Sequence, residues 1–225
     1  MKILLIGTVR SRSSYLLDIL CKYYGCNNLF EDYDRLYDIY LKRSKNTWIN
    51  YHEYLQKQTD FYFSNYQNFG IKFPTSIFHQ NNMSSESSTR LLNFNYGKFD
   101  KIFVTYRQNK VDLLCSYLLA KQKNQSFLYT KSNIENVKNF EKSIYLQVPN
   151  DSWFDNMFQS FSFVESIPTY FNDKQIPYTL LEYNDINNFV STYYNNIISN
   201  YHESNIDYKS IISNYSQISD ACKKY

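Results

Sequence analysis

Apolar and polar positions in the first part of the chain are arranged as a strand, a polar loop and a helix. Lys2–Ile6 is continuously apolar after its first residue, which is typical of a parallel strand buried on both faces. In Ser13–Tyr24 the apolar side chains recur at helical spacing, and Gly25 follows as a C-terminal cap. The loop between them carries Arg10 and Arg12 together with serines. This order predicts a loop that holds a negatively charged group.

The same alternation of strands and helices continues to the C-terminus. The pattern predicts further strands at Phe69–Phe73, Lys101–Tyr106 and Tyr178–Tyr183. It predicts helices over Asp32–Lys45, Trp48–Tyr66, Val111–Lys123 and Trp153–Phe171, and two more helices that end the chain. Strands that alternate with helices need crossover connections. We therefore expect an α/β fold with a central, mainly parallel sheet of four or five strands, and ligands at the carboxyl ends of those strands.

Length and patterning favour a single domain. A chain of 225 residues is long enough to bury a sizeable core, and no repeat or linker divides it. Asn124–Asn150 is polar and weakly patterned, so we expect a mobile loop or lid there. No signal-peptide pattern and no stretch of roughly 20 apolar residues is present. We expect a soluble, cytoplasmic protein without stable membrane insertion.

Composition and charge narrow the possible partners. The 24 Tyr and 17 Phe, beside only 4 Gly and 4 Pro, are explained by an AT-rich genome. A net charge of +3 suits a small anionic ligand and is too low for a duplex-DNA binder, so we expect no nucleic-acid partner. The four cysteines lack CxxC spacing and the three histidines are scattered, so no metal site is predicted. Cys21 and Cys115 are expected as small buried hydrophobic residues. The oligomeric state stays open.

The loop after the first strand is a candidate anion site. A helix that begins near Ser13 offers backbone N–H groups and the positive end of its dipole. Against the pattern GxxxxGK[ST], the segment GTVRSRSS has Gly7 and Ser14 in register, but Arg12 and Ser13 stand at the second glycine and the lysine. A nucleotide triphosphatase or P-loop kinase needs that lysine and usually a magnesium ion. Taken alone, the loop also fits a serine N-cap with solvated arginines.

A second strand, loop and helix repeat this arrangement in KIFVTYRQNKVDLLCSYLLAK. Arg107 stands at the carboxyl end of the strand, and Ser116 follows nine residues later in the helix. A guanidinium fork suits a phosphate, and a hydroxyl adds a donor. Two anion sites at the carboxyl edge of one parallel sheet indicate a ligand with two separate phosphate groups.

Together these residues resemble the sulfotransferases that use 3′-phosphoadenosine 5′-phosphosulfate (PAPS), most closely the bacterial trehalose-sulfotransferase branch. The family's loop for the 5′ phosphosulfate reads like PRSGST, and VRSRSS (Val9–Ser14) corresponds to it. Its 3′-phosphate motif corresponds to Arg107 and Ser116, with the spacing of that branch. FGIKF (69–73) and LLEYNDI (180–186) resemble two further family strands. The resemblance implies a three-layer, P-loop-like fold and one sulfotransferase-like domain over residues 1–225.

The resemblance also implies the reaction and its residues. A sulfuryl group would pass in line from PAPS to a hydroxyl of a carbohydrate or glycolipid-like acceptor, leaving adenosine 3′,5′-bisphosphate (PAP), without a metal. The residues implied for binding PAPS are Arg10, Ser11, Arg12, Ser13, Ser14, Arg107 and Ser116. Arg10 and the helix N-terminus would neutralise charge on the bridging oxygen. Glu31 is the candidate general base and His79 the alternative, although Glu31 also fits a solvated helix start and His79 a structural histidine.

The chain departs from the family at several points. Arg12 replaces the loop glycine, so the backbone has less room to approach a phosphate. Val9 replaces the preceding proline, and Gln217–Tyr225 matches poorly. Two other hypotheses stay open: a P-loop nucleotide kinase, and a non-catalytic nucleotide-binding module.

Overall fold

The computed structural model describes residues 1–8, 10–30, 51–73, 94–122, 144–194, 197 and 207–225. Its centre is a five-stranded sheet in the order β2-β3-β1-β4-β5, and every neighbouring pair of strands is parallel. The strands are β1 (Lys2–Gly7), β2 (Asn27–Asn28), β3 (Phe69–Lys72), β4 (Lys101–Tyr106) and β5 (Thr179–Glu182). Because β1 and β4 are neighbours, the loops that follow them leave the same edge of the sheet.

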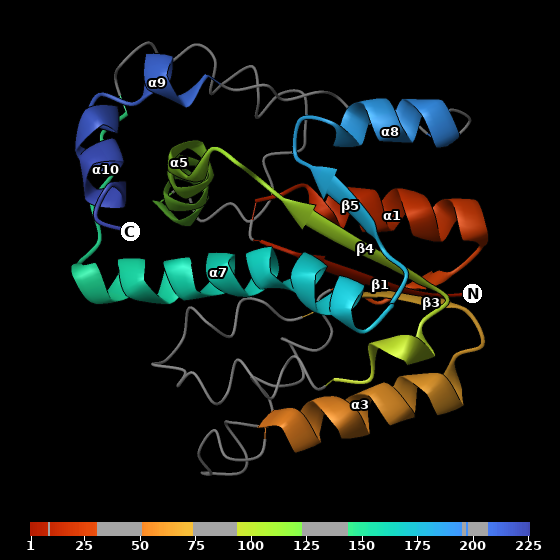
Figure 1. Ribbon diagram of the computed structural model, residues 1–225. Helices are drawn as coiled ribbons and strands as arrows, with labels where there is room; N and C mark the ends of the chain where they lie inside the picture. The colour runs from red at the N-terminus through yellow and green to blue at the C-terminus, as the bar shows by residue number, and fades with distance from the viewer. Residues whose placement is uncertain (9, 31–50, 74–93, 123–143, 195–196, 198–206) are drawn as a thin grey trace.

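Helices cover both faces of the sheet. They are α1 (Ser13–Tyr24), α3 (Tyr51–Asn65), α5 (Lys110–Gln122), α7 (Asp151–Asp173), α8 (Ile186–Tyr193), α9 (Tyr208–Ile211) and α10 (Tyr215–Cys222), with a 3-10 turn η3 at Tyr96–Lys98. In Figure 1, α1 and α8 lie on one side of the sheet and α3 and α7 on the other. The predicted three-layer α/β fold with a central parallel sheet is confirmed.

The central strand β1 shows why the layers form. Ile3 and Leu5 are buried in the cluster that includes residues of α1 and α8, whereas Leu4 and Ile6 are buried in the cluster with α3 and α7. Side chains alternate across a strand, so a continuously apolar strand needs cover on both faces.

A third hydrophobic cluster lies beyond the carboxyl ends of the strands. It joins α5 to the first half of α7 and to α9 and α10 (Figure 1). The cluster holds the C-terminal segment against the helix that follows β4. Residues from the end of the chain are thereby brought to the edge of the sheet where ligands bind in α/β folds.

The observed boundaries lie close to the predicted ones, with a few differences. The first helix and the fourth strand have the predicted bounds, and Gly25 caps α1 with a φ of 63°. Where the chain after β5 is described, it holds the three helices α8, α9 and α10 and not two, and the two-residue edge strand β2 was not predicted. The predicted helix 32–45 and most of the expected lid 124–150 lie outside the described residues.

The last part of the expected lid is tied to the C-terminal segment. Ile144 pairs with Ile212 in an isolated parallel bridge, and the Leu146 backbone N–H donates to the Asn214 side chain at 3.0 Å. Cys21 and Cys115 are buried free thiols, as expected, and burial raises the pKa of each to about 12. In the part of the chain that is described, no helix is both long and apolar enough to cross a membrane.

Candidate anion-binding site

The loop after β1 is locked onto β4 by hydrogen bonds. The Ser11 hydroxyl donates to the Thr8 carbonyl oxygen at 2.6 Å and lies 2.9 Å from the Thr105 hydroxyl. The Thr8 backbone N–H donates to the Thr105 carbonyl oxygen at 3.3 Å. A Cβ on Gly7 would lie 2.2 Å from the Thr105 hydroxyl oxygen, so the loop can pass this close to β4 only with glycine there. The fold thus sets the path of the loop before any ligand is present.

Two arginines in this loop have an unusual backbone. Arg10 and Arg12 have φ values of 59° and 60°, in the left-handed region that non-glycine residues seldom enter. Arg12 is the N-cap of α1, its side chain makes no capping hydrogen bond, and the first turn has no acidic residue. The alternative interpretation of a serine N-cap is therefore wrong. A helix N-terminus that is flanked by arginines and has no acidic residue in its first turn is suited to an anion.

A direct contact joins the two predicted phosphate motifs. The Arg10 side chain donates from Nε to the Ser116 hydroxyl oxygen at 2.9 Å, across 106 positions of sequence. Ser116 lies on α5 and is buried. The loop after β1 and the helix after β4 therefore line one site and not two remote ones.

Arg107 brings a third guanidinium group to the same place. Its Nη2 lies 3.4 Å from Asp112 Oδ2, and its side chain is 7% exposed. The guanidinium carbons of Arg107 and Arg12 each lie 4.2 Å from the centre of the Tyr183 ring. Guanidinium groups near an aromatic face are attracted by its quadrupole, so Tyr183 helps to hold two cations close together.

The electrostatics of this arginine cluster (Arg10, Arg12 and Arg107) favour an anion. Like charges that are brought together and partly desolvated raise the free energy of the site, and an anion among them lowers it. The loop that carries Arg107 is fixed by Glu182, which accepts hydrogen bonds from the backbone N–H groups of Gln108 and Asn184. The position of Arg107 thus depends on the side chain of Glu182 at the end of β5.

Sequence reasoning missed two tyrosines from the C-terminal segment. Tyr208 is buried, with the Arg107 guanidinium carbon 5.5 Å from its ring centre, and the neighbouring Ser116 side chain lowers the pKa of its hydroxyl. Tyr215 donates from its hydroxyl to Asp112 Oδ1 at 2.9 Å. Burial raises the pKa of Tyr215, and the bond to Asp112 raises it further. The contacts of Tyr208 with Arg107 and of Tyr215 with Asp112 join residues far apart in the sequence, so no local sequence pattern predicts them.

Two polar residues at strand ends were also missed. The Thr8 hydroxyl is buried and has no hydrogen-bond partner among the described residues. Lys72 is the last residue of β3 and is buried beside β1. A usable signal was present for both, because each is a polar residue directly at the carboxyl end of a buried strand. An unpartnered buried hydroxyl in the loop is a donor that a bound anion would satisfy.

The predicted site residues are distributed as follows. Arg10, Arg12, Arg107 and Ser116 lie together, and Ser13 and Ser14 form the first turn of α1 beside them. The Ser11 hydroxyl is engaged inside the fold with Thr8 and Thr105, so in this arrangement it stabilises the loop. Glu31 and His79 lie outside the described residues. Among the described residues, no group of three or more His, Cys, Asp or Glu side chains could hold a metal ion.

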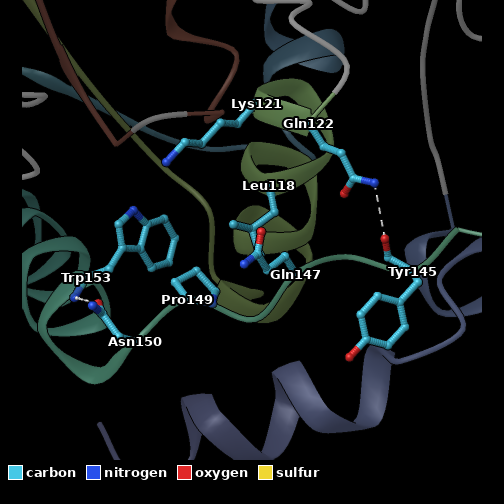
Figure 2. Close-up of a pocket in the computed structure, with 8 residues that line it drawn as sticks. All are labelled: Leu118, Lys121, Gln122, Tyr145, Gln147, Pro149, Asn150 and Trp153. Carbon is cyan, nitrogen blue, oxygen red and sulfur yellow. Dashed lines mark hydrogen bonds between the residues drawn. The ribbon is translucent and has the colours of Figure 1, made fainter.

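A separate pocket of about 680 Å³ lies beside the other end of α5 (Figure 2). Leu118, Lys121, Gln122, Tyr145, Gln147, Pro149, Asn150 and Trp153 line it. Trp153 and Lys121 lie on one side in Figure 2 and Tyr145 on the other. Two of the amides are already engaged, because Gln122 donates to the Tyr145 carbonyl oxygen and Asn150 accepts from the Trp153 backbone N–H.

Comparison with known proteins gives a distant likeness. No protein-family model and no curated protein matches the chain. Among solved structures, deoxyadenosine kinase from M. mycoides with bound dATP is similar, with a TM-score of 0.45 and 15% identity. The match covers 88% of this chain and 100% of the kinase chain. At this level the likeness assigns no function.

Proposed function

We propose that the protein is a sulfotransferase that moves a sulfuryl group from PAPS to a hydroxyl. The observation that carries the proposal is the contact between Arg10 and Ser116, which brings the loop after β1 and the helix after β4 into one site. Arg12 and Arg107 complete the site around Tyr183. A nucleotide with phosphate groups at both its 5′ and 3′ positions fits a site built from two such motifs.

The chemistry of sulfuryl transfer suits these groups. The donor already carries its leaving group, so the protein must neutralise charge that develops on the bridging oxygen. Arg10 and the uncapped N-terminus of α1 are the groups suited to that task. The acceptor hydroxyl must also lose a proton as it attacks. We propose Glu31 for that role, with His79 as the alternative.

For the acceptor we propose a carbohydrate or glycolipid-like molecule. The pocket in Figure 2 combines the aromatic rings of Trp153 and Tyr145 with amide groups and Lys121, a lining suited to sugar rings and hydroxyls. Leu118 in the pocket follows Ser116 by two residues, and helical residues two apart face different directions. The pocket would therefore hold a part of the acceptor away from the hydroxyl that reacts.

A nucleotide kinase is the second candidate. It is compatible with a parallel sheet whose central strand leads through a loop into a helix. Arg12 and Ser13 stand where a kinase loop has glycine and lysine, and this weighs against phosphoryl transfer. A non-catalytic nucleotide-binding module is the third.

A thermal-shift panel tests the proposal. We expect PAP to raise the melting temperature much more than adenosine 5′-phosphate, because only PAP has the 3′-phosphate. The panel also includes ATP with magnesium, which should stabilise the protein if it is a kinase. Transfer of labelled sulfate from PAPS to a panel of saccharides then separates an enzyme from a binding module. Stabilisation by ATP with magnesium but not by PAP would replace the sulfotransferase by the kinase.

A further inference from the structure

The C-terminal segment from Asp207 to Tyr225 reaches the arginine cluster through Tyr208. This residue begins α9 and is 4% exposed. The centre of its ring lies 5.5 Å from the guanidinium carbon of Arg107, and the neighbouring Ser116 side chain lowers the pKa of its hydroxyl. Tyr208 therefore lies beside both residues that were predicted to hold the second phosphate.

The hydroxyl of Tyr208 keeps its proton in this environment. Burial raises the pKa of Tyr208 and outweighs the lowering by the Ser116 hydrogen bond and by the charges of Arg107 and Arg10. A protonated phenol is a hydrogen-bond donor. It adds a donor to the site without adding a further positive charge to three guanidinium groups.

The segment around Tyr208 is held in place at several points. The Asp207 side chain accepts from the Lys209 backbone N–H and caps α9, and Ile212 pairs with Ile144. Tyr215 donates to Asp112, the same carboxylate that pairs with Arg107. A donor whose backbone is fixed on both sides loses little entropy when a ligand binds.

We propose that Tyr208 is a binding residue of the site, and that its hydroxyl donates to the phosphate held by Arg107 and Ser116. The proposal rests on the proposed function and extends it to the C-terminal segment, where no sequence motif was recognised. A hydroxyl hydrogen can rotate, so the Tyr208 and Ser116 hydroxyls can both donate to the oxygens of one phosphate. The C-terminal segment then contributes directly to the preference for a nucleotide with two phosphate groups.

The test is Tyr208→Phe in the full chain, with PAP and adenosine 5′-phosphate affinities measured by calorimetry. The substitution keeps the ring under Arg107 and removes only the hydroxyl. We expect PAP affinity to fall about tenfold, as for loss of one hydrogen bond to a charged group, and adenosine 5′-phosphate affinity to change less than about twofold. Tyr194→Phe is the matched control, because Tyr194 is also buried and its hydroxyl contacts Tyr24, not the site.

The ratio of the two affinities decides between the outcomes. An unchanged ratio in Tyr208→Phe, whether both affinities fall or neither does, would overturn the role of Tyr208. The wild-type affinities are measured before those of the variant. If the wild-type chain binds PAP no better than adenosine 5′-phosphate, the proposed function itself is wrong. If Tyr208→Phe does not fold, Tyr208→Met fills the same space with a flexible side chain and is judged by the same ratio.

Discussion

Arg107 is a buried cation whose surroundings explain its position. Burying a guanidinium group is costly unless it is paired and hydrogen-bonded. Here Asp112 lies 3.4 Å away and the Tyr183 ring lies 4.2 Å away, so the cost is offset before any ligand arrives. The distance to Asp112 is long for a strong charged hydrogen bond. An incoming phosphate can therefore engage Arg107 without breaking a tight pair.

Replacing Ser116 by alanine removes a hydroxyl that accepts a hydrogen bond from Arg10. We expect PAP affinity to fall roughly 10- to 100-fold, the share of one hydrogen bond to a charged group, while adenosine 5′-phosphate binds almost as before. Calorimetric titration of both nucleotides checks this. An equal loss of affinity for the two nucleotides would mean that Ser116 stabilises the loop after β1 and does not bind the 3′-phosphate.

Replacing Glu31 by glutamine separates an enzyme from a binder. If Glu31 takes the proton from the acceptor, turnover should fall by roughly 10²–10⁴ while PAP affinity stays within a few-fold, since the change keeps shape and removes only the base. Sulfate transfer and PAP binding are measured on the same preparations. A variant that keeps more than about a tenth of normal turnover would exclude Glu31 as the base, and His79→Ala would be made next.

At this scale, local pattern predicted some site residues and missed others for a physical reason. Arg107 was predictable because it directly follows a buried strand, and Arg10 because it lies in the loop that begins where another buried strand ends, where parallel strands place their ligands. Tyr208 and Tyr215 were not, because their roles arise from packing of the C-terminal segment on α5. Such tertiary contacts leave no periodic trace in the sequence.

Among the elements, the loop between β1 and α1 depends on its glycine. A Cβ at Gly7 would meet the Thr105 hydroxyl at 2.2 Å and the Ser11 hydroxyl at 2.9 Å. Gly7→Ala should therefore lower the free energy of unfolding by roughly 1–3 kcal/mol, the usual cost of overpacking. Gly97→Ala is the matched control, since its nearest atom is 3.8 Å away. Chemical denaturation checks both, and equal stability of the two variants would contradict a close approach of loop and strand.

The pocket beside α5 gives a prediction about acceptor length. Trp153→Ala should raise KM for an oligosaccharide acceptor roughly 3- to 10-fold, the share of one aromatic contact. It should leave a short acceptor and PAP affinity unaffected, because the pocket faces away from Ser116. Steady-state kinetics with acceptors of increasing length measures the difference. An equal rise for short and long acceptors would place the reacting hydroxyl in the pocket itself.

The elements differ in how well the sequence predicted them. Helix α1 and strand β4 have the predicted bounds because their apolar residues follow a clear pattern. For α1, Gly25 also marks the C-terminal end of the helix. The edge strand β2 has only Asn27 and Asn28, too few residues to show any period. The helices α8, α9 and α10 after β5 are short, and they pack in different places: α8 joins the cluster with α1, whereas α9 and α10 join the cluster with α5.

Across the whole molecule, three hydrophobic clusters support one charged edge. Two clusters fix the sheet between its helices, and the third holds the C-terminal segment against α5. The loops after β1 and β4 and the segment at Tyr208 therefore meet at the same edge although they are far apart in sequence. The net charge of +3 is low, so a small anion would be attracted by the local arginine cluster and not by the field of the whole chain.

The local arginine cluster leads to a prediction about divalent metals. A kinase depends on magnesium to neutralise its transferring phosphates. Here Arg10, Arg12 and Arg107 are grouped at one site, and fixed guanidinium groups can carry out the same neutralisation. We therefore expect sulfate transfer to proceed at the same rate in EDTA as in magnesium, within about twofold, with an ATP-dependent kinase assayed in parallel to show that the chelator is effective. Activity that disappears in EDTA and returns with magnesium would mean that the arginines do not suffice, and would favour phosphoryl transfer over sulfuryl transfer.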